Sequence, residues 1–431
     1  MSAEPAPSGR SVALRVLRRV VEHGGYSNLA MPAALDRAGL SAAERGLASE
    51  LAYGTLRRLL RIDWVLASRL DRPLGRTPSR ALALLRLGTY QLLFTRIPPH
   101  AAVFETVALA GSRERGFVNA VLRRVASDPP SWPSGSSDAD VSVRSGLARW
   151  AVGELRRQLG DEAEEAADAL AQRAPLTVRT NTCRTTVAEL ERALADASVE
   201  ATRGGIHPDS LVIGAGAPAE LPGFAEGWFA VQDQASSFVV RALGPRPGEL
   251  ILDACAGPGG KTGHIACLAA PTGRVVAADA SPTRSRLVRD QLSRLGLRAH
   301  VLAQDSRRPA LRGSFDRVLV DAPCSGIGAA RRRPELLWRP RKEELPALAR
   351  FQVSLASSAT ELLRPGGRLV YAVCTFPRAE TDAACEALLR RRPDLEPAEI
   401  QGPDGSEHQV RLWPHRHGAD AMFVAAFRRR I

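Results

Sequence analysis

The 431-residue sequence has no apolar run close to the roughly 18 residues that a membrane-spanning helix needs. Its start, MSAEPAPSGR, lacks the apolar core of a signal peptide. Its six cysteines show no CxxC spacing, which argues against a zinc knuckle or a secreted disulfide framework. These absences predict a cytoplasmic protein with reduced thiols, a disordered tail over residues 1–10 and no membrane partner.

Lysine is nearly absent, because the chain has 57 arginines and two lysines at a net charge of +13. Residues 1–150 alone hold 21 arginines, no lysine and 12 acidic residues. This basic third favours contact with phosphate backbones, although an arginine-rich composition of the whole chain is the simpler alternative. One of the two lysines, Lys261, lies in a glycine-rich turn, where ammonium and guanidinium groups are not interchangeable.

The first part of the chain reads as helical. From residue 11 to residue 126 apolar residues recur at helical spacing and no strand pattern competes, so we predict an all-helical domain, whose charge favours nucleic-acid contacts. Residues 127–145 are rich in proline, serine and glycine and lack periodicity, which predicts a linker. Residues 146–227 predict two helices and then a small α+β segment.

The second part alternates strands with helices from residue 228 to the end. The pattern predicts strands at 248–253, 273–278, 298–303, 315–320 and 367–373, and helices at 260–269, 282–295, 343–363 and 379–391. Such alternation indicates an α/β fold with a mostly parallel, doubly wound sheet. Strand-like stretches at 408–413 and 421–428 are expected to close its far edge.

A glycine-rich turn follows the first of these strands, in Asp253-Ala-Cys-Ala-Gly-Pro-Gly-Gly-Lys-Thr262. It is neither a Walker A loop, which would need glycine at Cys255, nor a dinucleotide fingerprint, which would need glycine at Thr262. The next two strands end in Asp279 and near Asp305. A single strand-end aspartate is usually a helix cap, but three beside a glycine turn suit an adenosyl ligand without phosphates. We therefore predict S-adenosylmethionine as the cofactor.

Two cysteines, Cys324 and Cys374, each close a predicted strand, where ligands of an open α/β sheet gather. Carbon 5 of cytosine is a poor nucleophile until a thiolate adds to carbon 6, so covalent catalysis suits this pair. Either thiol is a possible nucleophile by this reasoning. Asp321, three residues before Cys324, is placed to contact ring nitrogen 3. For the other cysteines, packing as small apolar side chains is the simpler interpretation.

Two further clusters have side chains that could bind a metal or RNA. His415 and His417 have the spacing of a metal pair, but with no other ligand nearby in sequence we predict a solvated loop and no metal. Arg331, Arg332, Arg333 and Trp338 suit contacts to substrate RNA, gripping the backbone and stacking a base, with a solvated charge run as the alternative. A base that must leave its stack is expected in a single strand or loop.

With these motifs, the chain resembles the Sun/NOL1/NOP2 family of RNA cytosine-5 methyltransferases, in its bacterial ribosomal-RNA branch. The resemblance rests on the 253–262 turn, on Asp321-Ala-Pro-Cys-Ser-Gly326, on Tyr371-Ala-Val-Cys374 and on Trp413-Pro-His415. The N-terminal helices resemble the NusB-like domain of that branch through Tyr53-Gly-Thr-Leu-Arg57, Leu87-Gly-Thr-Tyr-Gln-Leu92 and Phe117-Val-Asn-Ala-Val-Leu-Arg123.

The resemblance implies a Rossmann-like class I methyltransferase domain that acts on a cytosine of 16S ribosomal RNA, and we expect a monomer. It makes Cys374 the nucleophile and Cys324 the thiol that helps release the product. It implies that Asp321 contacts the cytosine and that Lys261 orients this carboxylate. Besides Asp253, the cofactor-binding residues that it implies are Ala254, Cys255, Ala256, Gly257, Pro258, Gly259, Gly260, Lys261, Asp279, Arg284, Asp305 and Asp321.

The sequence departs from the family pattern near the expected site. The usual Ser-Thr-Cys-Ser reads Ala372-Val373-Cys374-Thr375, the usual Glu-Asn reads Glu380-Thr381, and Asp-Gly-Phe-Phe reads Asp420-Ala-Met-Phe423. These changes put the rate and target preference in question rather than the chemistry. The competing hypothesis is a ribosome-assembly or antitermination RNA-binding factor whose methylase domain is vestigial.

Overall fold

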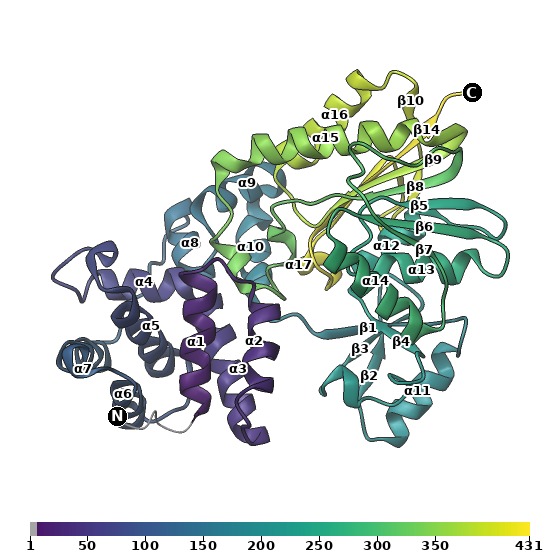
Figure 1. Ribbon diagram of the computed structural model, residues 1–431. Coiled ribbons are helices and arrows are strands. Elements are labelled where there is room, and N and C mark those ends of the chain that lie inside the picture. The colour runs from purple at the N-terminus through teal and green to yellow at the C-terminus, as the bar shows by residue number, and fades with distance from the viewer. Residues whose placement is uncertain (1–6) are drawn as a thin grey trace. The chain divides into compact units, whose positions relative to one another are not determined.

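The computed structural model describes residues 7–431 and divides into two compact units (Figure 1). One unit comprises Met1–Gln172 with Ala330–Pro340, and the other Arg173–Ala329 with Arg341–Ile431. Of the tail expected over residues 1–10, residues 1–6 lie outside the described part. Residues 9 and 10 are helical, because the Ser8 side chain accepts from the Ser11 backbone N–H and caps the helix.

The helical unit confirms the all-helical prediction for the N-terminal region. Its apolar stripes meet in one core, and Gly54 lies so close to the Tyr90 ring that a Cβ atom there would clash. Residues 138–145, expected within the linker, instead form a helix capped by Ser137. The helices are α1 (Gly9–Val21), α2 (Ser27–Asp36), α3 (Ala42–Arg57), α4 (Leu59–Ala67), α5 (Ser79–Phe94), α6 (Pro99–Ala108), α7 (Ser112–Ser127), α8 (Asp138–Ser145), α9 (Arg149–Leu159) and α10 (Ala163–Ala171).

A distant stretch, residues 330–340, completes the helical unit, and we call it the arm. The carboxylate of Glu335 is fully buried and accepts from the backbone N–H and hydroxyl of Ser27, at 3.1 and 2.6 Å. The indole N–H of Trp338 donates to the Leu56 carbonyl at 2.9 Å. The arm thus caps α2 and packs beside α3.

The second unit begins with a small antiparallel sheet of strand order β2-β3-β1-β4. Just after β1, the buried Asn181 side chain donates to the carbonyls of Gly227 and Leu295, at 2.8 and 2.9 Å. This segment is the small α+β part that the sequence predicts. Its elements are β1 (Leu176–Thr180), α11 (Val187–Asp196), β2 (Ala201–Arg203), β3 (Ser210–Ile213) and β4 (Phe229–Val231).

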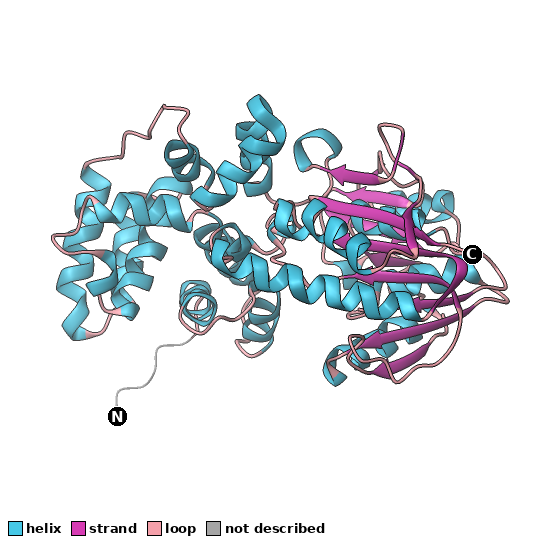
Figure 2. Cartoon of the chain, turned by 90° about the horizontal axis from the view of Figure 1, so that it is seen from above, coloured by secondary structure: helices cyan, strands magenta, loops and turns pink. Residues whose placement is uncertain are grey.

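The larger sheet has the order β10-β14-β9-β8-β5-β6-β7, with β13 beside β14 (Figure 2). Strands β5 to β9 pair in parallel, whereas β14 runs antiparallel to β9. The strands are β5 (Leu250–Asp253), β6 (Arg274–Asp279), β7 (His300–Ala303), β8 (Phe315–Asp321), β9 (Leu363–Val373), β10 (Leu395–Pro397), β13 (Gln409–Leu412) and β14 (Met422–Arg429). Two short strands, β11 (Ile400–Gln401) and β12 (Ser406–Glu407), pair separately.

Helices cover both faces of this sheet, as its alternating side chains require. Ile251, Leu319 and Val370 belong to the core beneath α12 to α14, whereas their neighbours Leu252 and Val320 belong to the core beneath α15 and α16. The structure therefore confirms the doubly wound α/β prediction. The helices are α12 (Gln234–Leu243), α13 (Gly260–Ala269), α14 (Pro282–Leu295), α15 (Leu345–Glu361), α16 (Asp382–Arg391) and α17 (Pro414–His417).

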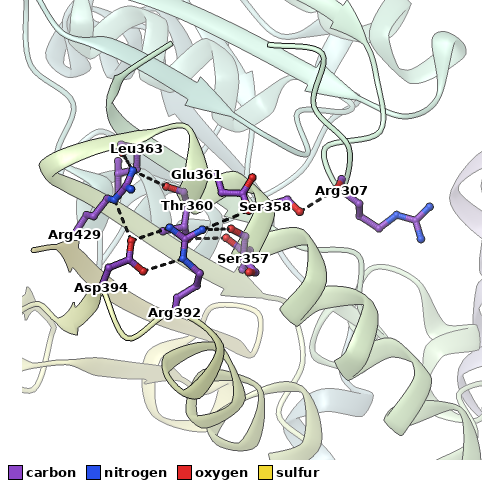
Figure 3. Close-up of polar contacts among 10 residues, drawn as sticks. Arg307, Ser357, Ser358, Thr360, Glu361, Leu363, Arg392, Asp394 and Arg429 are labelled. Carbon is purple, nitrogen blue, oxygen red and sulfur yellow. Dashed lines mark hydrogen bonds and ion pairs between the residues drawn. The ribbon is translucent and has the colours of Figure 1, made fainter. Parts of the chain in front are cut away.

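An ionic network fastens α15 to the strands beside it (Figure 3). Asp394 accepts from Arg392 at 2.7 Å and from Arg429 at 3.0 Å. Arg392 also donates to the Ser357 carbonyl at 3.0 Å. Hydrogen bonds and charge from Arg392 lower the pKa of Asp394 to about 2. Within residues 7–431, no helix is long and apolar enough to cross a membrane.

Candidate functional site

The two strand-end cysteines meet at the carboxyl edge of the parallel sheet. Strands β8 and β9 are parallel neighbours with Asp321 opposite Ala372, so the segments that leave them run side by side. The sulfur atoms of Cys324 and Cys374 lie 3.4 Å apart. The Cys374 carbonyl accepts from the Gly328 backbone N–H at 3.0 Å, which ties the two segments together again. The sequence placed these thiols on separate strands, and the topology brings them together.

The contact between the sulfurs has an electrostatic consequence. The hydrogen bond that Cys324 shares with Cys374, in which either sulfur can donate, raises the pKa of Cys324 well above its ordinary value, and burial and the nearby Glu380 and Asp321 carboxylates raise it further. A thiol that donates a hydrogen bond stabilises a thiolate that accepts it. Cys324 is therefore suited to hold a proton while Cys374 is ionised.

A buried carboxylate, Glu380, clamps both cysteine segments. Its Oε1 accepts from the Ser325 backbone N–H at 2.9 Å, and its Oε2 accepts from the Ser325 hydroxyl at 2.5 Å. The Thr375 hydroxyl lies 3.5 Å from Oε2 and 2.7 Å from the Ser325 hydroxyl. The residues that follow Cys324 and Cys374 therefore share one anchor. Burial raises the pKa of Glu380, although its hydrogen bonds oppose that shift.

Gln352 and Tyr371 hold this anchor in place. The Gln352 amide donates to Glu380 at 2.9 Å and to the Pro323 carbonyl at 3.0 Å. The Tyr371 hydroxyl donates to the Glu380 carbonyl at 2.7 Å. Sequence reasoning noted Glu380 only as part of a departure from the family pattern, and it missed Gln352. A polar residue on a helix that otherwise faces the core was the available signal.

Lys261 and Asp321 form an ion pair beside the thiols. The Lys261 Nζ donates to Asp321 Oδ2 at 2.7 Å, and both side chains are largely shielded from water. Burial alone would lower the pKa of Lys261, but the Asp321 carboxylate outweighs it and the net shift is upward. Lys261 therefore stays charged and can orient Asp321, which is the position that the resemblance implies for it.

The glycine turn after β5 is hydrogen-bonded to the strands on either side. The backbone N–H of Ala254 donates to Leu319 of β8, and that of Ala256 donates to Ala278 of β6, both at 2.9 Å. Asp253 is buried and accepts from the Thr262 hydroxyl at 2.7 Å, and burial raises its pKa to about 6. Asp253 thus positions the start of α13. Its Oδ1 is buried with no partner among the described residues.

The remaining turn residues form an open backbone surface. Gly257 and Gly260 are half-buried, Pro258 is exposed, Cys255 is half-buried, and Gly259 has a positive φ of 108° that favours glycine. A Cβ atom on Gly257 would lie 2.6 Å from Asp279 Oδ2 and 2.7 Å from the Cβ of Arg284. A side chain at position 257 would therefore clash with Asp279 and Arg284, which pack directly against the turn.

The other two strand-end carboxylates reach the same edge. Asp279 accepts from the Gly257 backbone N–H at 3.0 Å and pairs with Arg284 at 3.4 Å. Arg284 in turn donates to the Gly257 carbonyl at 2.5 Å. Asp305 is more exposed and is held by Arg307 at 2.6 Å, which lowers its pKa. Asp279 and Arg284 thus contact the turn directly, whereas Asp305 faces Arg307.

The expected RNA-contact residues lie in the arm, within the helical unit. Arg331 is buried and its carbonyl accepts from Arg57 at 3.0 Å, whereas Arg332 and Arg333 are half-buried. Trp338 packs against the helical core. The sequence could not show this location, because the arm interrupts the methyltransferase part of the chain.

A cluster of possible metal ligands occurs elsewhere in the second unit. The ligand atoms of His207, Asp209 and His264 lie within 4.8 Å of one another. Burial and the nearby Arg179 lower the pKa of His207 to about 4, and burial lowers that of His264 well below its ordinary value. The sequence did not point to this cluster. Of the histidines that it did single out, His417 accepts from the Trp413 backbone N–H at 2.9 Å.

Family models match most of the chain. Residues 240–428 match the model described as 16S rRNA methyltransferase RsmB/F. Residues 7–127 match the NusB family, and residues 147–220 match the ferredoxin-like domain of RsmF/B-like methyltransferases.

Relatives and solved structures match over nearly the full length. The chain is 36% identical to the ribosomal RNA small subunit methyltransferase B of Vibrio cholerae, over 96% of each chain. It is 40% identical to a Mycobacterium tuberculosis protein that has been named as a methyltransferase, over 99% of this chain and 97% of that one. The crystal structure of the protein PH0851 superposes with a TM-score of 0.83 at 26% identity and covers 99% of both chains.

Proposed function

Because the chain belongs to the RsmB/F family of 16S rRNA methyltransferases, we propose that it methylates carbon 5 of a cytosine in that RNA through a covalent adduct on Cys374. One observation carries the proposal. Two thiols 3.4 Å apart lie at the sheet edge where the Lys261–Asp321 ion pair also lies. Covalent activation of a pyrimidine needs a thiolate, a group that stabilises the ring nitrogens and a second proton acceptor. This edge supplies all three.

The glycine turn fits S-adenosylmethionine as the methyl donor. The buried Oδ1 of Asp253, which has no partner among the described residues, and the Asp279 carboxylate, which lies against the Gly257 backbone, both suit a polar ligand held close to the turn. We assign the binding surface to residues 254–261 with Asp279, Arg284, Asp305 and Asp321. When bound there, the cofactor supplies an electrophilic methyl group, which the activated carbon 5 accepts.

Cys374 acts as the nucleophile in the first step, and Cys324 acts as the base in the last step. The Cys374 thiolate forms a bond to carbon 6, and ring nitrogen 3 gains a proton from the solvent-linked Asp321–Lys261 pair. After methyl transfer, carbon 5 carries both a methyl group and a proton. Cys324 first releases its own proton to water and, as a thiolate, takes the proton from carbon 5. The ring double bond re-forms, the bond from Cys374 to carbon 6 breaks to restore the Cys374 thiolate, and ring nitrogen 3 returns its proton to the Asp321–Lys261 pair. The adduct itself favours this last step, because a bonded Cys374 no longer raises the pKa of Cys324 as a thiolate does.

The helical unit supplies RNA contacts in this account. It matches the NusB family and contains most of the excess arginine of the chain. We propose that Arg332 and Arg333 of the arm add phosphate contacts, whereas Arg331 and Trp338 hold the arm on the unit. An unpaired cytosine is the expected target, since a base must leave its stack to reach a thiol.

Transfer of a labelled methyl group to 16S rRNA tests the proposal. Replacing Cys374 with Ala should abolish transfer to cytosine carbon 5, whereas Cys385→Ala should keep it, since Cys385 is a buried core residue of α16 with no role in the proposed reaction. Undiminished transfer by C374A would refute the nucleophile. If the wild-type chain also fails to bind S-adenosylmethionine in calorimetry, the vestigial RNA-binding factor becomes the better account.

A further inference from the structure

A second pair of cysteines lies in the second unit, apart from the residues of the proposed reaction. The sulfur atoms of Cys183 and Cys267 lie 2.8 Å apart. Cys183 is exposed in the turn that follows β1, whereas Cys267 is buried in the last turn of α13. Neither residue touches the Cys324–Cys374 pair in any contact described above, so the proposed reaction does not explain this juxtaposition.

The turn that carries Cys183 is held rigidly against α13. Asn181 anchors the turn through its side chain, and its carbonyl accepts from the Arg184 backbone N–H at 2.8 Å. The Thr182 hydroxyl lies 3.4 Å from the Cys267 sulfur, and the Cys183 thiol donates to the Cys267 carbonyl at 3.3 Å. These hydrogen bonds hold the two thiols next to each other.

A buried cation lies near the pair. Arg179 is almost fully buried, and its Nη2 has no hydrogen-bond partner among the described residues. Burial raises the pKa of Cys183 to about 12, and Arg179 opposes this shift because its charge stabilises a thiolate. Cys183 is therefore protonated at neutral pH and becomes more reactive as the pH rises.

We propose that Cys183 and Cys267 form a redox-sensitive dithiol that closes to a disulfide when a low-molecular-weight disulfide such as oxidised glutathione is present. The exposed Cys183 attacks first, forming a mixed disulfide and releasing one thiol. Cys267 then attacks the Cys183 sulfur and releases the second thiol. The protein loses two protons and two electrons, and the small disulfide gains both as it becomes two thiols. A thiol reductant reverses the reaction.

Closure needs little movement, because a disulfide bond is about 2.0 Å long and these sulfur atoms already lie 2.8 Å apart. The bond would join the small sheet to α13 across a long stretch of chain. Helix α13 also carries Lys261 in its first turn, so the cross-link fastens the helix that orients Asp321. We expect the oxidised protein to melt higher, by roughly 5 °C.

Peptide mapping without reduction tests the proposal on the full chain. After oxidised glutathione at pH 8.5, digestion should give one peptide pair joined through Cys183 and Cys267, and dithiothreitol should separate it. In Cys267→Ser, Cys183 should instead retain bound glutathione, because the resolving thiol is gone. The Cys374→Ala background removes competing oxidation of the other pair, and Cys385→Ala should change nothing.

Three outcomes would overturn the proposal. One is a wild-type Cys183 that keeps glutathione as the Cys267 variant does. Another is a joined peptide with an unchanged melting temperature, which would remove the fastening role. The third is protection of both thiols from alkylation when Zn²⁺ alone is added to the reduced protein, because the pair would then be a ligand set for the ion rather than a redox dithiol.

Discussion

At the scale of single residues, the proposed reaction requires that Cys324 and Cys374 influence each other's protonation. The hydrogen bond with Cys374 is the first cause of the raised pKa of Cys324, so the protonation of Cys324 depends on the state of its partner. Removing the donor leaves a Cys374 thiolate without its nearest hydrogen bond. The reactivity of Cys374 toward alkylation therefore reports on the partner.

We predict that Cys324→Ala raises the pH at which Cys374 becomes reactive, by about one pH unit. The reason is that a lost S–H donor destabilises the thiolate. Iodoacetamide labelling of Cys374 from pH 6 to pH 10, read by peptide mass spectrometry, measures the shift. Cys324→Ser keeps a donor and should shift the curve less. A curve that stays in place or moves to lower pH in the alanine variant would contradict the coupling.

Glu380 acts through the segments that it anchors, so we predict a positioning role. Glu380→Gln should lower kcat roughly 10- to 100-fold, because the amide keeps only one of the two acceptor oxygens that hold the Ser325 and Thr375 segments, and the thiols lose alignment. KM for the cofactor should change little. Glu386→Gln, in the helix α16 that follows and 50% exposed, serves as the matched control. A variant that lost cofactor affinity as much as turnover would point to general unfolding instead.

The chemistry-bearing residues could be predicted, but their supports could not. Cys324, Cys374 and Asp321 stand at strand ends, and strand ends of a parallel sheet converge whatever the detailed packing. Glu380 and Gln352 meet only because α15 and the segment before α16 pack on one face of the sheet. That meeting depends on side-chain packing across 28 residues of chain, which no local pattern encodes.

At the scale of elements, the spacing of apolar residues predicted helix boundaries well where the apolar and polar faces of a helix differ strongly. The predicted helices at 260–269 and 282–295 match α13 and α14 residue for residue. Helix α2 was not predicted, because Pro32 and scattered apolar residues hide its face. The arm was not predicted to join the helical unit, since its capping residue Glu335 lies 308 residues from Ser27.

We predict that Glu335→Ala lowers the free energy of unfolding of the helical unit by about 2 kcal/mol. The Ser27 N–H and hydroxyl would lose a buried charged acceptor, and such groups cost about 1–3 kcal/mol each when left unpaired. Urea unfolding followed by tryptophan fluorescence measures this loss. Glu343→Ala, an exposed site just beyond the arm, should have little effect. Equal stability of both variants would show that the arm is not held by this contact.

The Asp394 network predicts a specific acid sensitivity. Folding lowers the pKa of Asp394 to about 2, so its stabilisation is present above about pH 4 and is lost as the pH falls toward 2. Asp394→Asn should cost about 1 kcal/mol at pH 7, a value reduced because the carboxylate is 35% exposed. Thermal unfolding from pH 2.5 to pH 7 measures both. The exposed Asp290→Asn is the control, and an unchanged acid profile in D394N would contradict the network.

At the scale of the whole molecule, the chain combines a basic helical unit with a unit that contains the candidate site. Family models for the NusB, ferredoxin-like and methyltransferase parts fall in the order that the sequence predicts. Charge, periodicity and motif spacing sufficed for this order because each acts within a short stretch. The membership of residues 330–340 in the helical unit could not be found in this way, since it depends on the tertiary fold.

The most direct test of the account is the identity of the cysteine that bonds to RNA. Cys324→Ala should accumulate a protein–RNA adduct in the presence of S-adenosylmethionine, because the proton acceptor for release is gone. After nuclease and protease digestion, mass spectrometry should find the modified nucleotide on the peptide that contains Cys374. The double variant C324A/C374A should form no adduct. A nucleotide found on any other residue, or an adduct that survives in the double variant, would contradict the central claim.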